Sequence, residues 1–295
     1  MTTAPPPPNP IALLKQAGLI AKPSWGQNFL LDQSILAETA RLAVGEPPAT
    51  VLELGAGLGA LTYHLLVAGA RVIAIERDRE IAPLLRQALA WSAQLEVVEA
   101  DAVRLDYGVY AARSGGPLAV AGNLPYQLSS RILVSIAEAR EYVARAVVLL
   151  QLEVAERLVA APGGRDYGLL SVLVQRSFAV HIARHVPPGA FHPRPKVQSA
   201  VVVLERESVG REVSADRALV AAARAAFHGR RKMLRNSLAT ALDCANVTVD
   251  AAIHAAGLSP QTRAETLSID DFARLGAALL DAGLLSRACE GPVAD

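Results

Sequence analysis

The chain has 295 residues, of which 52% are hydrophobic and 19% charged, so it carries enough apolar surface for a core and is not intrinsically disordered. Its two cysteines, Cys244 and Cys289, argue against a disulfide framework and a four-ligand zinc site, and no apolar run reaches the roughly 18 residues of a membrane span. The composition predicts a globular, cytoplasmic protein with one large domain, or with a large and a small one.

Charge is unevenly distributed although the formal net charge is only +1. Residues 1–100 carry seven Lys or Arg and nine Asp or Glu, whereas residues 176–235 carry twelve and four. A basic segment late in the chain suits a polyanion such as RNA. The alternative is a solvated basic surface without a partner.

The chain begins with a segment that contains four consecutive prolines at positions 5–8, which favour an extended chain over a helix or a central strand. We therefore expect residues 1–20 to form a flexible tail. The polar residues 286–295 are expected to form a second one.

Residues 21–205 are expected to form one α/β domain. Short apolar runs alternate with amphipathic helical segments, and these runs lie at 51–55, 71–76, 95–101, 117–123 and 146–154. Apolar residues at consecutive positions indicate strands covered on both faces, as in a doubly wound, Rossmann-like parallel sheet. The runs at 169–186 and 197–205 predict an antiparallel pair at the edge, so that about seven strands form the sheet and the last is antiparallel.

Residues 212–285 are rich in alanine and predict a small all-helical domain, interrupted at Gly257, Gly276 and Gly283. A continuous helix near its start would place four basic side chains on one face, where they could follow an RNA backbone: Arg224, His228, Arg231 and Arg235. The alternative is that Arg231 or Arg235 pairs with a carboxylate of the first domain and fixes a domain interface.

Three glycines follow the first strand of the α/β domain, namely Gly55, Gly57 and Gly59, and such a turn lets a ligand approach the backbone closely. Their G-x-G-x-G spacing differs from the G-x-G-x-x-G of dinucleotide sites, which disfavours a nicotinamide-dependent oxidoreductase. The next two strands end in Glu76 and Asp101, on the edge of the sheet where ligands bind. Either carboxylate alone could be an ordinary polar strand end, but with the glycine turn they predict an adenosyl site.

The segment Asn123–Tyr126 reads NLPY and follows the fourth strand. The Asn123 side-chain oxygen and the main-chain carbonyl beside Pro125 can accept hydrogen bonds from an exocyclic amine, and the Tyr126 ring offers a stacking face for a base. Two acceptors that orient the amine hydrogens direct its lone pair towards a methyl sulfonium. The alternative is an ordinary proline-containing turn.

These motifs, with four further stretches, resemble the S-adenosylmethionine-dependent ribosomal RNA adenine dimethyltransferases, and within that family the enzymes of small-subunit (16S) rRNA. The further stretches are GQNFL at 26–30, PPGAFHPRPKVQSAV at 187–201, FHGRRKMLRNSL at 227–238 and RAETLS at 263–268. The resemblance covers nearly the whole chain from residue 22 to about residue 278. The sequence departs from the family pattern at Trp25, Leu152 and Gln198.

The histidines and cysteines show no metal-ligand spacing, so we expect no metal site, and we expect a monomer. The resemblance implies dimethylation of the N6 amines of two adjacent adenosines in a 3′-terminal hairpin of 16S rRNA during ribosome biogenesis. It implies seven cofactor-binding residues: Asn28, Leu30, Gly55, Gly57, Glu76, Asp101 and Asn123. Gly55 would meet the amino-acid end of the cofactor, Glu76 its ribose and Asp101 its adenine. The target base would meet Asn123, Leu124, Pro125, Tyr126 and Phe191, and RNA would contact Arg230, Arg231, Lys232 and Arg235.

Two alternatives remain beside this interpretation. The first is a 23S rRNA adenine methyltransferase of the macrolide-resistance type, which shares the glycine turn and an NLPY-like motif but is less similar in the C-terminal stretches. The second is a non-catalytic nucleic-acid-binding relative with the same fold, which the intact Asn123–Tyr126 motif, Glu76 and Asp101 disfavour.

Overall fold

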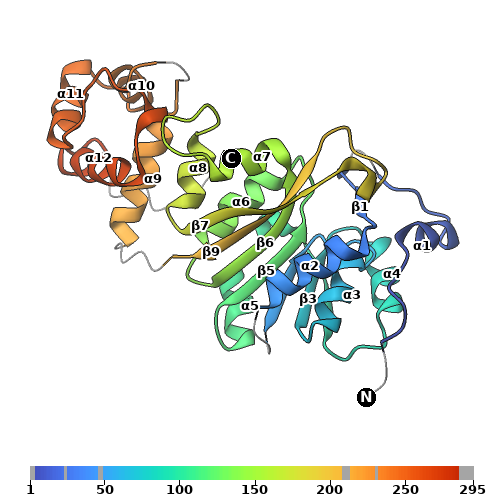
Figure 1. Ribbon diagram of the computed structural model, residues 1–295. Coiled ribbons are helices and arrows are strands. Elements are labelled where there is room, and N and C mark those ends of the chain that lie inside the picture. Colours follow the sequence, from blue (N-terminus) through green and yellow to red (C-terminus); the bar gives the residue numbers. More distant parts are fainter. Residues whose placement is uncertain (1–3, 23–24, 46–48, 208–212, 230–231, 286–295) are drawn as a thin grey trace. The chain divides into compact units, whose positions relative to one another are not determined.

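The computed structural model describes residues 4–22, 25–45, 49–207, 213–229 and 232–285 (Figure 1). The chain divides into two compact units, of which the first comprises residues 1–156 and 178–207 and the second residues 157–177 and 208–295. Each unit has its own hydrophobic core.

The first unit is built on a seven-stranded sheet, whose strands are β2 (Thr50–Leu54), β3 (Arg71–Glu76), β4 (Leu95–Glu99), β5 (Leu118–Asn123), β6 (Val143–Gln151), β7 (Phe178–Val186) and β9 (Ser199–Arg206). Their spatial order is β4-β3-β2-β5-β6-β9-β7. β2 to β6 pair in parallel, whereas β9 is antiparallel to both of its neighbours. This confirms the doubly wound sheet with an antiparallel last strand.

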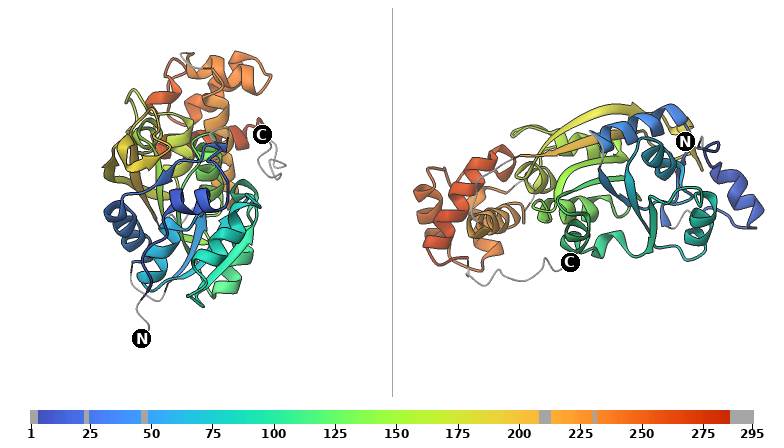
Figure 2. Two further views of the ribbon diagram at one scale, coloured as in Figure 1. Left: turned by 90° about the vertical axis from the view of Figure 1, so that its right-hand side faces the viewer. Right: turned by 90° about the horizontal axis from the view of Figure 1, so that it is seen from below.

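Helices cover both faces of this sheet (Figures 1 and 2), and they are α2 (Gln33–Val44), α3 (Ala60–Val67), α4 (Ile81–Ala88), α5 (Tyr107–Ser114) and α6 (Ser129–Glu138). The β2 residues from Val51 to Leu54 are accordingly at most 2% exposed. Burial from two sides is the reason that Val51, Leu52 and Leu54 are apolar although neighbouring residues face opposite sides of the sheet. A separate two-stranded ladder joins β1 (Phe29–Leu30) to β8 (Phe191–His192).

The expected N-terminal tail contains a short helix, α1 (Pro10–Gln16). Asn9 caps it by accepting hydrogen bonds from the Ile11 and Ala12 amides, at 3.0 and 3.2 Å, and Pro10 suits the first helical position. Leu14 is buried in a cluster with Phe29, Leu58 and Ile81. The expectation of a flexible tail over residues 1–20 is therefore wrong for α1, because its apolar side packs against the first unit.

The second half of the sheet contains a further difference from the sequence prediction. Residues 169–186 were expected to be one strand, but their first part is the helix α8 (Leu169–Gln175), and only β7 is extended. The apolar run LLSVLVQ has no period that separates a buried helix from a buried strand. Ser171 favours the helix here, because its hydroxyl accepts a hydrogen bond from Gly168 N at 3.0 Å at the start of α8.

The second unit is helical and contains α8, α9 (Val213–Ala226), α10 (Leu234–Ala241), α11 (Asn246–Ala255) and α12 (Ile269–Asp281). Its core includes Tyr167, whose hydroxyl donates to the Leu267 carbonyl at 3.0 Å. Residues 157–177 thus belong to the helical unit, although the sequence placed them within 21–205. Residues 286–295 lie outside the described part of the chain.

Gly276 lies inside α12 and does not interrupt it, contrary to the sequence prediction. A Cβ atom at this position would lie 2.6 Å from the backbone of Ala218 in α9. The glycine is therefore explained by the close approach of two helices. Within the described residues, no helix has both the length and the apolar character needed to cross a membrane.

Candidate functional site

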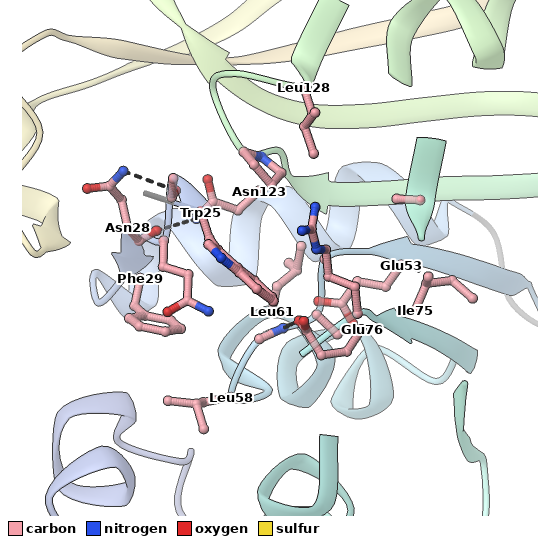
Figure 3. A pocket seen from close by; sticks show the side chains of 18 of the residues that line it. Trp25, Asn28, Phe29, Glu53, Leu58, Leu61, Ile75, Glu76, Asn123 and Leu128 are labelled. Atoms are coloured by element: carbon pink, nitrogen blue, oxygen red, sulfur yellow. Dashed lines mark hydrogen bonds between the residues drawn. The ribbon is translucent and has the colours of Figure 1, made fainter. Parts of the chain in front are cut away.

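A cavity lies at the carboxyl ends of β2, β3 and β5 and beside the loop that follows β4 (Figure 3). Ligands of open α/β sheets bind at this edge, because loops diverge there and leave a crevice. All seven residues that the sequence predicted for a cofactor line it: Asn28, Leu30, Gly55, Gly57, Glu76, Asp101 and Asn123. The fold thus collects in one place residues that lie up to 95 positions apart.

Glu76, at the end of β3, fixes the glycine turn. Its Oε2 accepts a hydrogen bond from Gly57 N and its Oε1 one from Asp78 N, both at 2.8 Å. Burial raises the pKa of the Glu76 carboxyl. Gly57 has a φ of +56° and a Cβ there would lie 3.3 Å from the Phe29 ring, so the turn needs a glycine for both conformation and space.

Glu53 is a second buried carboxyl in the wall of this cavity, and the sequence analysis gave it no role. It lies on β2, two residues before Gly55, and is 2% exposed. Its Oε2 has no hydrogen-bond partner among the described residues. Burial, with a further contribution from the nearby Glu76, raises the pKa of Glu53 to about 8. Its position at the same strand end as the glycine turn was the signal that could have found it.

Asp101 lies on the exposed side of the cavity. Its Oδ1 accepts a hydrogen bond from Val103 N at 3.0 Å and so begins the 3-10 turn η2 (Ala102–Arg104). This bond orients the carboxylate at the end of β4.

Asn123, at the end of β5, is joined to the segment that begins at Lys22. Its Nδ2 donates to the Asn28 carbonyl at 2.7 Å (Figure 3). The same segment is tied to Asp78, whose Oδ2 accepts from Lys22 Nζ at 2.8 Å and from Gln27 Nε2 at 3.2 Å. These bonds hold one wall of the cavity in place and leave the Asn123 Oδ1 as an acceptor.

Trp25, one of the departures from the family pattern, is at the edge of the cavity and is 38% exposed. The Arg77 guanidinium lies 4.3 Å and the Lys22 ammonium 4.9 Å from its ring centroid. Such cation–π contacts give an exposed indole a defined position.

The predicted base-contacting residues differ in how deeply they are buried. Leu124 is buried, Pro125 lines the cavity, and the half-buried Tyr126 has its hydroxyl 2.8 Å from Ser199 Oγ. Phe191 is only 4% exposed because it belongs to the core and pairs with Leu30 in the β1–β8 ladder. Its ring is therefore largely covered in this structure, and the contact with the target base that the resemblance implies stays a prediction.

The basic stretch of the second unit is not one helix. α9 ends at Ala226 and α10 begins at Leu234, so Arg224 and Arg235 lie on different helices and the predicted common face does not exist. Arg235 pairs with Asp250 of α11, inside the helical unit rather than with the first domain. Lys232 is exposed, and the predicted Arg230 and Arg231 lie outside the described residues.

The residues present fit an adenosyl cofactor with an amino-acid end. Gly57 lies in a turn with no room for a side chain beside the Phe29 ring, Glu76 and Asp101 stand at successive strand ends, and the buried Glu53 lines the cavity with one oxygen that has no hydrogen-bond partner among the described residues. Over the part of the chain that the structure describes, no group of three His, Cys, Asp or Glu side chains could hold a metal ion.

Comparisons with known proteins agree with this geometry. Residues 18–280 match the profile of a family described as Ribosomal RNA adenine dimethylase. The chain is 50% identical over 284 residues to Ribosomal RNA small subunit methyltransferase A of Anaeromyxobacter dehalogenans, with 92% of this chain and 98% of the relative covered. It is 44% identical to the protein of the same name from Myxococcus xanthus, with 92% and 95% covered.

Two solved structures share the fold. A dimethyladenosine transferase from Plasmodium falciparum superposes with a TM-score of 0.70 at 24% identity, covering 86% of this chain and 98% of that one. The 23S rRNA methyltransferase ErmE superposes with a TM-score of 0.63 at 29% identity, covering 85% and 99%.

Proposed function

Since the chain belongs to the ribosomal RNA adenine dimethylase family, we propose that it methylates the N6 amines of two adjacent adenosines in the 3′-terminal hairpin of 16S rRNA, with S-adenosylmethionine as the donor. The observation that carries this proposal is the position of Asn123 and Tyr126 beside a cavity built for an adenosyl ligand. Relatives named for the small subunit favour 16S over 23S rRNA, because they reach 50% identity while ErmE has 29%.

The cofactor would lie across successive strand ends. Asp101 would contact its adenine, Glu76 would accept hydrogen bonds from its ribose hydroxyls, and Gly55 would meet its amino-acid end. Asn28 and Leu30 would cover it from the opposite wall. When bound there, S-adenosylmethionine supplies an electrophilic methyl group.

Asn123 would orient the target amine. Its amide nitrogen already donates to the Asn28 carbonyl, so its Oδ1 is left to accept from the amine, and the Leu124 carbonyl would be the second acceptor. With its hydrogens held, the nitrogen presents its lone pair to the methyl carbon. Methyl transfer would replace the C–S bond of the donor by an N–C bond, and the amine proton would pass to water, so the site would need no strong base.

The target adenine would leave its helix and stack on Tyr126. Phe191 would support this segment from the core through its pairing with Leu30. The helical unit would contact the rRNA backbone through Lys232 and its basic neighbours. We further propose that the protein acts as a metal-free monomer on a small ribosomal subunit or its precursor in the cytoplasm.

Methyl transfer to purified ribosomal subunits tests this proposal. Small subunits that lack the modification should yield N6,N6-dimethyladenosine by mass spectrometry of the nucleosides, and large subunits should yield none. Asn123→Ala should abolish the product while S-adenosylhomocysteine still binds. A product found only in 23S rRNA would favour the ErmE-like alternative, and RNA binding without any product would favour a non-catalytic relative.

A further inference from the structure

The four consecutive prolines at positions 5–8 have no role in the proposed function, and they lie outside the family match, which begins at residue 18. Proline fixes its own φ near −65° and disfavours the helical region for the residue before it, so four in a row adopt a polyproline II helix. Helix α1 begins directly afterwards, at Pro10, and its Leu14 is buried against the first unit. The proline segment is therefore tied at one end to a fixed helix.

Tyr63 of α3 contacts this segment. Its hydroxyl donates a hydrogen bond to the Pro5 carbonyl at 2.7 Å. A run of prolines has no amide hydrogens, so it offers a partner only carbonyl oxygens and apolar ring faces. A surface that recognises such a run therefore needs hydrogen-bond donors and flat apolar side chains, which aromatic residues combine in proline-binding grooves. Tyr63 supplies both from one side chain.

Two aromatic neighbours orient the Tyr63 ring. Its centroid lies 6.0 Å from that of Trp91, which follows α4, and 5.2 Å from that of His64, and both contacts are edge-on. His64 Nε2 is in turn 2.9 Å from Gln33 Oε1 of α2. Trp91 is 40% exposed, and its indole N–H is a second donor of the kind that a proline run requires. The pair of Tyr63 and Trp91 is thus a preformed aromatic surface on the first unit.

The exposure of the prolines agrees with docking along one edge. Residues 5–7 are exposed and Pro8 is half-buried. A polyproline II helix has three residues per turn, so one edge can lie on a surface while the other two face the solvent. Because the segment is stiff before it docks, it loses little conformational entropy on docking, and few contacts are enough to hold it.

We propose that Tyr63 and Trp91 form a binding surface for a polyproline segment, and that the chain fills this surface with its own residues 5–8. The docked segment fixes the start of the arm that continues into α1 and Leu14. Both rings lie outside the set of residues that line the cofactor cavity, so the proposal does not rest on the proposed function.

Fluorine NMR of the full chain labelled with fluorotryptophan tests this docking. The chain has two tryptophans, Trp25 and Trp91, so the spectrum has two signals, and Trp91→Phe assigns them. The serine variant combines four substitutions, Pro5→Ser, Pro6→Ser, Pro7→Ser and Pro8→Ser. It should shift the Trp91 signal towards its position in the unfolded chain and leave the Trp25 signal in place.

A peptide added to the serine variant tests whether the surface recognises proline. A short tether gives an effective concentration in the millimolar range, so a peptide of residues 1–10 at about 10 mM should return the Trp91 signal to its wild-type position. The same peptide with four serines in place of the prolines should not. Tyr63→Phe in the serine variant should weaken peptide binding about fivefold, since one hydrogen bond is lost. Tyr142→Phe, at an exposed tyrosine before β6, is the matched control and should leave peptide binding unchanged.

Four results would overturn the proposal. A Trp91 signal that is the same in the wild type and the serine variant would show that residues 5–8 do not dock. A shift that the proline peptide does not reverse, or that the serine peptide reverses equally, would show that the surface does not recognise proline. Equal peptide binding with and without the Tyr63 hydroxyl would remove its hydrogen bond from the recognition. A wild-type Trp91 signal that moves on dilution would assign the docked segment to a second copy of the chain.

Discussion

The Tyr126 and Ser199 hydroxyls lie 2.8 Å apart and join the loop after β5 to the start of β9. Ser199 is fully buried, so it can fix the direction of the half-buried tyrosine ring. A residue on a different strand thereby controls the stacking face proposed for the target base.

Removing either hydroxyl should misplace this ring. We expect Tyr126→Phe and Ser199→Ala each to lower single-turnover methylation of small subunits about fivefold, the equivalent of one hydrogen bond of about 1 kcal/mol, with cofactor affinity within twofold of wild type. Because both variants break the same bond, the double variant should be no slower than either single one. Ser130→Ala, at an exposed position of α6, is the control.

If the two single effects add in the double variant, the hydroxyls act separately and the positioning role of Ser199 is wrong. A loss of cofactor affinity in Ser199→Ala would instead indicate a general disturbance of the first unit. Melting temperatures of the wild type and the four variants are needed to compare them at equal stability.

At this scale the sequence predicts residues that belong to local motifs and misses partners that are distant in the chain. Glu76 and Asp101 could be predicted because each lies at the carboxyl end of an apolar run, on the edge of the sheet where ligands bind. Ser199 is 73 residues from Tyr126, and no spacing rule links the two. Phe191 was assigned from the resemblance, and its burial depends on the pairing with Leu30, which a single sequence does not reveal.

Helix α1 packs against two residues that also line the cofactor cavity, Phe29 and Leu58, through the buried Leu14. We expect Leu14→Ala to destabilise the first unit by about 2 kcal/mol, at the lower end of large-to-small core substitutions, because the cluster is small. It should also weaken S-adenosylhomocysteine binding several-fold by loosening the wall of the cavity. Thermal unfolding and calorimetry measure the two effects.

Ile11→Ala is the matched control, since Ile11 lies on the same helix and is 40% exposed. Ile11→Ala should change neither the stability of the first unit nor the affinity for S-adenosylhomocysteine measurably. A Leu14→Ala protein that loses stability but binds the ligand normally would limit α1 to a structural role.

Gly276 permits the close packing of α12 on α9. We expect Gly276→Ala to destabilise the helical unit by a few kcal/mol, because the added methyl group would overlap the Ala218 backbone, which cannot move as a flexible side chain can. Ala277→Ser, at the exposed neighbouring position, should be close to neutral in the same denaturant titration. Gly276→Ala with unchanged stability would mean that the helices separate at little cost.

At the scale of elements, the buried parallel strands could be predicted and the helical unit only in part. The run 72–75 is apolar at every position and lies between helical segments, as expected for a strand covered on both faces. The run 169–175 is also largely apolar but is a helix, because its neighbours in the helical unit bury it. The break between Ala226 and Leu234 was missed because the basic residues suggested a continuous helical face.

For the whole molecule, the exposed Lys232 and the paired Arg235 should respond to salt in different ways. Lys232→Ala should weaken binding of ribosomal particles and reduce the slope of log affinity against log salt by about one, since one phosphate contact is lost. Arg235→Ala leaves Asp250 without its ion-pair partner and should lower the melting temperature while the slope changes little. Particle binding measured from low to moderate salt shows whether each substitution removes a phosphate contact.

An unchanged slope in Lys232→Ala would remove this residue from the RNA-contacting surface. Cofactor affinity should stay at the wild-type value in both variants, because the cavity lies wholly in the first unit. A change in cofactor affinity would mean that the substitution disturbs the fold rather than a contact with RNA.

The place of β9 between β6 and β7 has a consequence for synthesis on the ribosome. The strand that completes the sheet is the last one made, and it enters between two strands that do not pair with each other in the folded sheet. Until Arg206 has emerged, the nascent chain exposes the unpaired edges of both β6 and β7, which are sites for aggregation. Residues 157–177 remain without their core partners for longer still, since these partners lie in α9 to α12 and are synthesised later. Fragments that stop before residue 207 should therefore be insoluble, and chaperones would be needed longest while the last third of the chain is translated.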